Sequence, residues 1–218
     1  MYRILDEWSK EHPLRVRFLN KVRGIGPVLS SGIIAWLASE RLFTVRKVVE
    51  LDGGAVKVRR KDRVEEIELP PGARIVEYNR KEGYIRVWAP EVMRAAEKVS
   101  QLFKYAGLVP GQRRVAGRKA DHNPRVKNLM WKVWSSFIKQ RGFGRKLIDA
   151  YLAKFKAEHP DWPLAKCRAY TFKPVARLFL AAVWEFWRTM EGLPVTEPYP
   201  ISVLGHADKI GPKHWMEK

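Results

Sequence analysis

The chain has 218 residues, of which 46% are hydrophobic and 11% aromatic, so it can bury a core and is not expected to be disordered. It has no apolar run close to the roughly 20 residues that a membrane span needs, and its single cysteine excludes a disulfide framework. Lys and Arg number 42 against 23 Asp and Glu, a net charge of +19. A domain that basic repels itself unless it has an anionic partner, so the composition favours nucleic-acid binding.

The same features suggest where the protein works. The N-terminal residues are charged and amphipathic, without the apolar segment of a signal peptide, so we expect a cytoplasmic protein with no membrane partner. An ion-rich surface of the thermophile kind is the alternative source of the charge. Thermophilic proteins gain both acidic and basic residues, so a thermophile surface does not explain the excess of basic residues.

The first block, residues 1–43, predicts three helices. Their positions are near Tyr2–Glu11, near Pro13–Val22 and after Pro27. Pro13 and Pro27 suit the first turn of a helix, where a missing N–H costs nothing.

Residues 44–90 change character and predict an inserted sheet. They are dense in Val, Ile and Tyr, alternate in places such as "AVKVR" and "YIRVW", and are interrupted by Gly, Pro and Asp turns. We predict four or five short strands between 45 and 88 that form a small antiparallel sheet.

Residues 91–190 return to helical patterns. Asn123 and Pro124 read as a cap and a first-turn proline, and apolar residues then recur every three or four positions. Residues 191–218 have no sustained period and predict an irregular tail. The predicted fold is mainly α with a small inserted antiparallel β-sheet, an α+β arrangement with a helix-hairpin-helix and a C-terminal helical bundle.

The turn before Pro27 raises the first functional hypothesis. Two helical patterns flank Gly24, Ile25 and Gly26, and this order is typical of a helix-hairpin-helix. Glycines permit unusual backbone angles and let a phosphate approach the amides at a helix N-terminus. We therefore predict that Lys21, Arg23 and these three residues contact a phosphate backbone, with an ordinary helix–helix turn as the alternative.

A second hypothesis follows from where the charge lies. From Lys104 to Lys146 the chain has twelve Lys and Arg and one acid, Asp121, a net charge of +11. A basic loop here enters a helix whose exposed face is also basic, which makes a stripe suited to phosphates. A merely solvated face is the alternative. The side chains predicted to bind nucleic acid are Arg113, Arg114, Arg118, Lys119, Arg125, Lys132 and Lys139.

Two stretches also carry a family resemblance. "FLNKVRGIGPVLSSGIIAWLASERLFTV" followed by "SQLFKYAGLVPGQRRVAGRK" resembles the C-terminal Tnp domain of transposases of the insertion-sequence 110/116/902 group. The resemblance covers residues 14–43 and 100–188, interrupted by the predicted sheet. It implies a role in DNA recombination guided by an RNA.

Two departures limit what the resemblance implies. Family members carry an N-terminal RuvC-like nuclease domain with four metal-binding acids, and this sequence has no counterpart of it. The family's catalytic serine would fall at Ala116, which has no nucleophile. The sequence thus predicts no catalytic residue, no metal site and no cofactor.

Three functions stay open at this point. The first is a non-catalytic DNA-binding protein related to such a transposase, with RNA as the other ligand. The second is a transposase or recombinase subunit that works with a separate nuclease domain. The third is a ribosome- or chromatin-associated structural protein, in which the sheet insert or the tail contacts a protein partner or a second copy.

Overall fold

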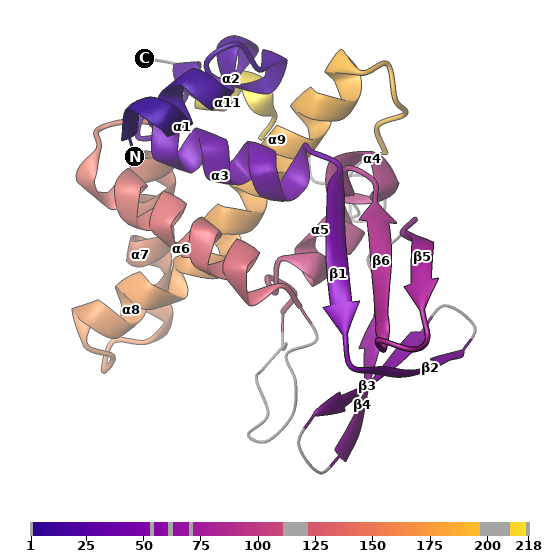
Figure 1. The fold of residues 1–218 in the computed structure, drawn as a ribbon. Helices are drawn as coiled ribbons and strands as arrows, with labels where there is room; N and C mark the ends of the chain where they lie inside the picture. The colour runs from indigo at the N-terminus through magenta and orange to yellow at the C-terminus, as the bar shows by residue number, and fades with distance from the viewer. Residues whose placement is uncertain are drawn as a thin grey trace. The chain divides into compact units, whose positions relative to one another are not determined.

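The computed structural model describes residues 2–52, 55–60, 63–69, 72–110, 122–196 and 210–216. Its elements divide into two compact units (Figure 1). A helical unit comprises Met1–Trp36 and Glu97–Lys218, and a β unit comprises Leu37–Ala96. The mainly α fold with a small antiparallel β insert is confirmed.

The helical unit is built from short N-terminal helices and longer C-terminal ones. In chain order they are α1 (Tyr2–Ser9), α2 (Pro13–Arg17), the 3₁₀ turn η1 (Leu19–Lys21), α3 (Pro27–Leu37), α5 (Val99–Tyr105), α6 (Pro124–Lys139), α7 (Phe143–Glu158), α8 (Leu164–Tyr170), α9 (Phe172–Met190) and α11 (Pro212–Trp215).

Helix α9 forms the centre of this unit. It contacts α5, α6, α7, α8 and α11, and its apolar stripe includes the buried residues Val175, Phe179, Val183 and Trp187. In the tail, which the sequence predicts to be irregular, Trp215 on α11 is 1% exposed. The Trp215 ring packs on Phe137 and Phe179, so this part of the tail belongs to the core.

The helix predicted over Pro13–Val22 is shorter in the structure. Helix α2 ends at Arg17, and Phe18 leaves helical geometry with φ −129° and ψ −65°. The buried residues that follow, Leu19, Val22 and Ile25, recur every three positions. That is the period of a 3₁₀ turn rather than an α-helix, which explains why the chain tightens there.

The cap predicted for α6 is present. The Asn123 side-chain oxygen accepts hydrogen bonds from the backbone N–H of Arg125 (3.0 Å) and Val126 (3.3 Å). Pro124 occupies the first turn, where no N–H is needed.

In the described residues, the β unit contains six strands in two antiparallel sheets, not the four or five strands in one sheet that the sequence predicts, and also the short helix α4 (Val92–Ala95). One sheet has the order β1-β6-β5 and the other β2-β3-β4. The strands are β1 (Arg41–Arg46), β2 (Val48–Asp52), β3 (Ala55–Arg60), β4 (Arg63–Glu68), β5 (Arg74–Asn79) and β6 (Tyr84–Ala89).

The two sheets share one small core made by Val48, Val56, Val58, Ile85 and Val87. The strand region begins earlier than the pattern indicates, because Arg41–Arg46 pairs along its whole length with β6. Lys47, between β1 and β2, has a φ of 60°, and the chain passes from one sheet to the other at this residue.

Candidate nucleic-acid interface

The two glycines of the turn between η1 and α3, residues 22–26 and called the hairpin below, differ in their surroundings. Gly24 has a φ of 96°, in the region that favours glycine, and is half-buried. A Cβ added to it would lie 3.3 Å from side-chain atoms of Ser136, Phe137 and Gln140. Glycine at position 24 is therefore required by the fold itself.

Gly26 has no such requirement. It is exposed, its φ lies outside the left-handed region, and an added Cβ would meet nothing within 4 Å. Its carbonyl accepts the backbone N–H of Ser30 (2.9 Å), so it occupies the N-cap position of α3. The next free amides of the first turn belong to Val28 and Leu29, since Pro27 has none.

Ile25 lies between them with its side chain in the core, only 6% exposed. Of the residues predicted to touch nucleic acid, it can do so only through its main chain. The buried side chain instead anchors the turn between two exposed neighbours.

Helix α6, which is more than a hundred residues away in the sequence, packs against the hairpin. The Ser136 hydroxyl donates a 2.6 Å hydrogen bond to the Gly24 carbonyl. Further along, a Cβ on Gly32 would come within 2.9 Å of Leu129, and the Arg125 guanidinium lies 5.5 Å from the Trp36 ring centre. Helix α3 therefore runs antiparallel to α6, with the hairpin at the C-terminal end of α6.

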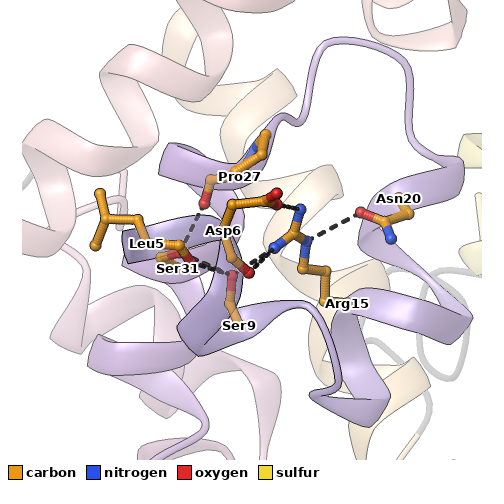
Figure 2. Close-up of polar contacts among 7 residues, drawn as sticks. All are labelled: Leu5, Asp6, Ser9, Arg15, Asn20, Pro27 and Ser31. Atoms are coloured by element: carbon orange, nitrogen blue, oxygen red, sulfur yellow. Dashed lines mark hydrogen bonds and ion pairs between the residues drawn. The ribbon is translucent and has the colours of Figure 1, made fainter. Parts of the chain in front are cut away.

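A polar network around the buried side chains of Ser9, Arg15 and Ser31 connects α3 to the N-terminal helices (Figure 2). The Arg15 guanidinium pairs with the Asp6 carboxylate and donates hydrogen bonds to Ser9 Oγ (2.7 Å) and Asn20 Oδ1 (3.1 Å). Ser31 Oγ lies 2.9 Å from Ser9 Oγ and donates to the Pro27 carbonyl at 2.7 Å. Ser31, in the second turn of α3, thereby joins this helix to α1.

His12 makes a hydrogen bond and a ring contact beside this network. Its Nδ1 accepts the backbone N–H of Leu14 (3.3 Å), which caps α2, and its ring stacks on Trp187 with centroids 5.4 Å apart. Burial lowers the pKa of His12, an effect that the negative charge of Glu191 partly offsets. The neutral imidazole is the form that caps the helix.

The predicted cations of the hairpin and of α6 are exposed. They are Lys21 and Arg23 before the turn, and Arg125, Lys132 and Lys139 on α6. Lys132 and Lys139 lie one turn on either side of Ser136, so the helical repeat puts them on the face that meets Gly24. Arg125 lies 14 residues from Lys139, about 21 Å along the axis.

These cations differ in their partners from two cations of the β unit, Lys57 and Arg63. Among the described residues, no carboxylate forms an ion pair with these five cations of the hairpin and α6. In the sheets, by contrast, Lys57 pairs with Glu50 (2.8 Å) and Arg63 with Glu65 (3.1 Å). No described carboxylate therefore neutralises the predicted cations of the hairpin and α6.

The basic loop is the part of the predicted site that lies outside the described residues. It contains Arg113, Arg114, Arg118 and Lys119, together with Ala116. The described chain resumes at His122, immediately before α6, so the loop joins the end of α6 that carries Arg125.

The sequence reasoning missed one neighbour of the hairpin, the turn between α6 and α7. An added Cβ on Gly142 would lie 2.9 Å from the Cβ of Arg23, so this turn and the hairpin are in contact. The signal was present as a repeat: Arg23-Gly24-Ile25-Gly26 is matched by Arg141-Gly142-Phe143-Gly144.

No family model, curated protein or solved structure matches this chain. In the described ranges, no helix is both long and apolar enough to cross a membrane. The same residues contain no group of three or more His, Cys, Asp or Glu that could hold a metal ion.

Proposed function

We propose that this protein is a non-catalytic nucleic-acid-binding protein, with DNA as its principal ligand, that grips the phosphate backbone. The contacts would come from the amides at the start of α3 and from the cations of the α6 face. A backbone grip of this kind positions a nucleic acid without reading its sequence.

The observation that carries the proposal is Gly26. Packing and backbone angle both explain Gly24, but neither explains a glycine at 26, where a side chain would enter open space. A bare helix N-terminus there leaves two amides accessible to an anion. Lys132 and Lys139 flank the point where this corner rests on α6, and no described acid neutralises them.

The sequence resemblance supports a relation to transposases. It includes the hairpin and the "YAGLVPGQRR" stretch. It also supports the absence of catalysis, because Ala116 stands where the family has its serine. We propose that the chain keeps the grip of such a domain and has lost its chemistry.

Salt-dependent binding tests the grip. Fluorescence anisotropy of a labelled duplex, at salt between about 50 and 200 mM, gives the slope of log affinity against log salt. With five phosphate contacts, we expect a slope of about −4.5 on duplex DNA, and about −3.5 on a single strand. Equivalent RNA ligands, titrated in parallel, show which nucleic acid is bound more tightly.

A matched pair of variants locates the contacts. Lys132→Ala with Lys139→Ala removes two cations from α6, and Lys57→Ala with Arg63→Ala removes two from the β unit. We expect the slope of log affinity against log salt to be smaller in magnitude by about 1.8 for the α6 variant and unchanged for the β variant. Equal losses would contradict the proposed surface, and cleavage or strand transfer of DNA with Mg²⁺ would contradict the absence of catalysis.

A further inference from the structure

A cationic pocket lies at the turn between α6 and α7, beside the hairpin. It has a volume of about 370 Å³ and is lined by Ile138, Lys139, Gln140, Arg141, Arg145 and Asp149. Three of these side chains are basic and one is acidic, so the pocket carries a net positive charge. Only Lys139 among them belongs to the surface proposed above.

One of the cations is held in place by its neighbours. Arg145 Nε donates to both carboxylate oxygens of Asp149, at 2.9 and 2.8 Å, and Nη1 donates to the Ile138 carbonyl at 2.7 Å. Its Nη2 has no protein partner within the described residues. A guanidinium fixed in this way binds an anion with little further loss of side-chain entropy.

The pocket adjoins the hairpin through two contacts. An added Cβ on Gly24 would lie 3.3 Å from Cγ of Gln140, and the Arg23 side chain runs along Gly142. Elements more than a hundred residues apart therefore form one surface in the helical unit. The pocket therefore lies next to the turn that precedes α3.

The glycines of the second turn do not themselves indicate a ligand. An added Cβ on Gly144 would collide with the Phe137 ring at 2.6 Å, and one on Gly142 would collide with Arg23. Close packing accounts for both. The cations of the pocket favour an anionic ligand: Lys139 and Arg141 are exposed and have no ion pair with a described acid, and Arg145 is oriented by Asp149.

We infer that this pocket is a second phosphate subsite, which receives a phosphate of the same nucleic-acid strand that the α3 hairpin holds. The inference rests on the proposed function, and it adds Arg141 and Arg145 to the binding surface. Arg141 supplies charge, and Arg145 supplies a fixed pair of N–H donors that a planar guanidinium can direct at phosphate oxygens.

Three variants test the subsite in the anisotropy assay with duplex DNA. For Arg141→Ala we expect a roughly five- to tenfold weaker affinity and a slope reduced by about 0.9. For Arg145→Lys, which keeps the charge, we expect a roughly threefold or greater loss of affinity at an unchanged slope. The reason is that an ammonium group lacks the planar pair of N–H donors of a guanidinium. Lys154→Ala is the control for removing one cation, since Lys154 lies far along α7 and pairs with Glu158 at 3.8 Å.

The outcomes separate this inference from the proposed function. Weaker binding in both pocket variants, with Lys154→Ala close to wild type and melting temperatures unchanged, supports the subsite. Pocket variants that bind like Lys154→Ala, while the double change at Lys132 and Lys139 still reduces the slope, overturn the subsite and leave the proposed function standing. A wild-type protein that binds no nucleic acid overturns both.

Discussion

Replacing Gly26 with Asp should make the protein more stable and strongly weaken its binding to nucleic acid. Asp is among the best N-cap residues, so its carboxylate should accept the N–H groups of Val28 and Leu29. A cap better than glycine contributes a few tenths of a kcal/mol, and a negative charge at a helix N-terminus about 0.3–1 kcal/mol. Since the new side chain enters open space, nothing offsets these gains.

The expected gain is about 1 kcal/mol, which raises Tm by roughly 2–4 °C for a chain of this size. Binding should change in the opposite direction. The two amides would no longer be available, and each hydrogen bond to a charged group is worth about 1.5–3 kcal/mol. The loss is therefore about 3 kcal/mol or more, at least a hundredfold in Kd.

Thermal denaturation followed by circular dichroism and anisotropy with duplex DNA measure the two effects. Gly26→Asn is the control, because it caps the same amides without the charge, and it should lose affinity to a smaller degree. A Gly26→Asp protein that melts higher and binds DNA as well as wild type would refute the role of these amides. One that melts several degrees lower would refute the open space around Gly26.

Three further changes test the supports of the hairpin. Gly24→Ala should reduce the free energy of unfolding by about 2 kcal/mol, because alanine must take a left-handed φ and crowd α6. The Tm should fall by roughly 4–8 °C, and an unchanged Tm would refute the packing on Ser136. Asp6→Ala should reduce the free energy of urea unfolding by about 2 kcal/mol, since it leaves the buried Arg15 guanidinium without its carboxylate. Asp6→Asn should lose less of this free energy than Asp6→Ala. Because the pKa of His12 is lowered in the fold, its contribution to stability is complete above its ordinary value of 6.5 and is lost as pH falls through the folded value. His12→Asn keeps a cap without this titration, so its urea midpoint should fall less than that of wild type between about pH 7 and pH 5; parallel curves would contradict the role of the imidazole.

Local signals made parts of the fold predictable from the sequence. Asn123 and Pro124 predict the start of α6 because a cap depends only on residues within one turn. The turn-rich, β-branched composition of residues 44–90 likewise predicts strands. The division into two sheets was not predictable, because it depends on the chain changing sheets at Lys47, and lysine carries no signal for a left-handed φ.

The candidate site was predictable in its residues but not in its assembly. The hairpin and the basic helix stand out separately in the sequence, each by a local pattern. Their contact through Ser136 and Gly24 joins positions 112 residues apart, and no periodicity reports such a distance. The turn between α6 and α7 repeats the Arg-Gly-x-Gly order, yet the repeat alone does not say that Gly142 lies against Arg23.

The register between α3 and α6 decides whether amides and cations act together. Gly32 lets Leu129 approach closely, and this contact sets which residue of α6 reaches Gly24. A slip of one residue would rotate the face of α6 by about 100°, which would carry Ser136 off the hairpin and turn Lys132 and Lys139 away with it. One glycine in the middle of α3 therefore serves the proposed site as directly as those in the turn. It keeps the bare helix end and the unpaired cations on a common surface.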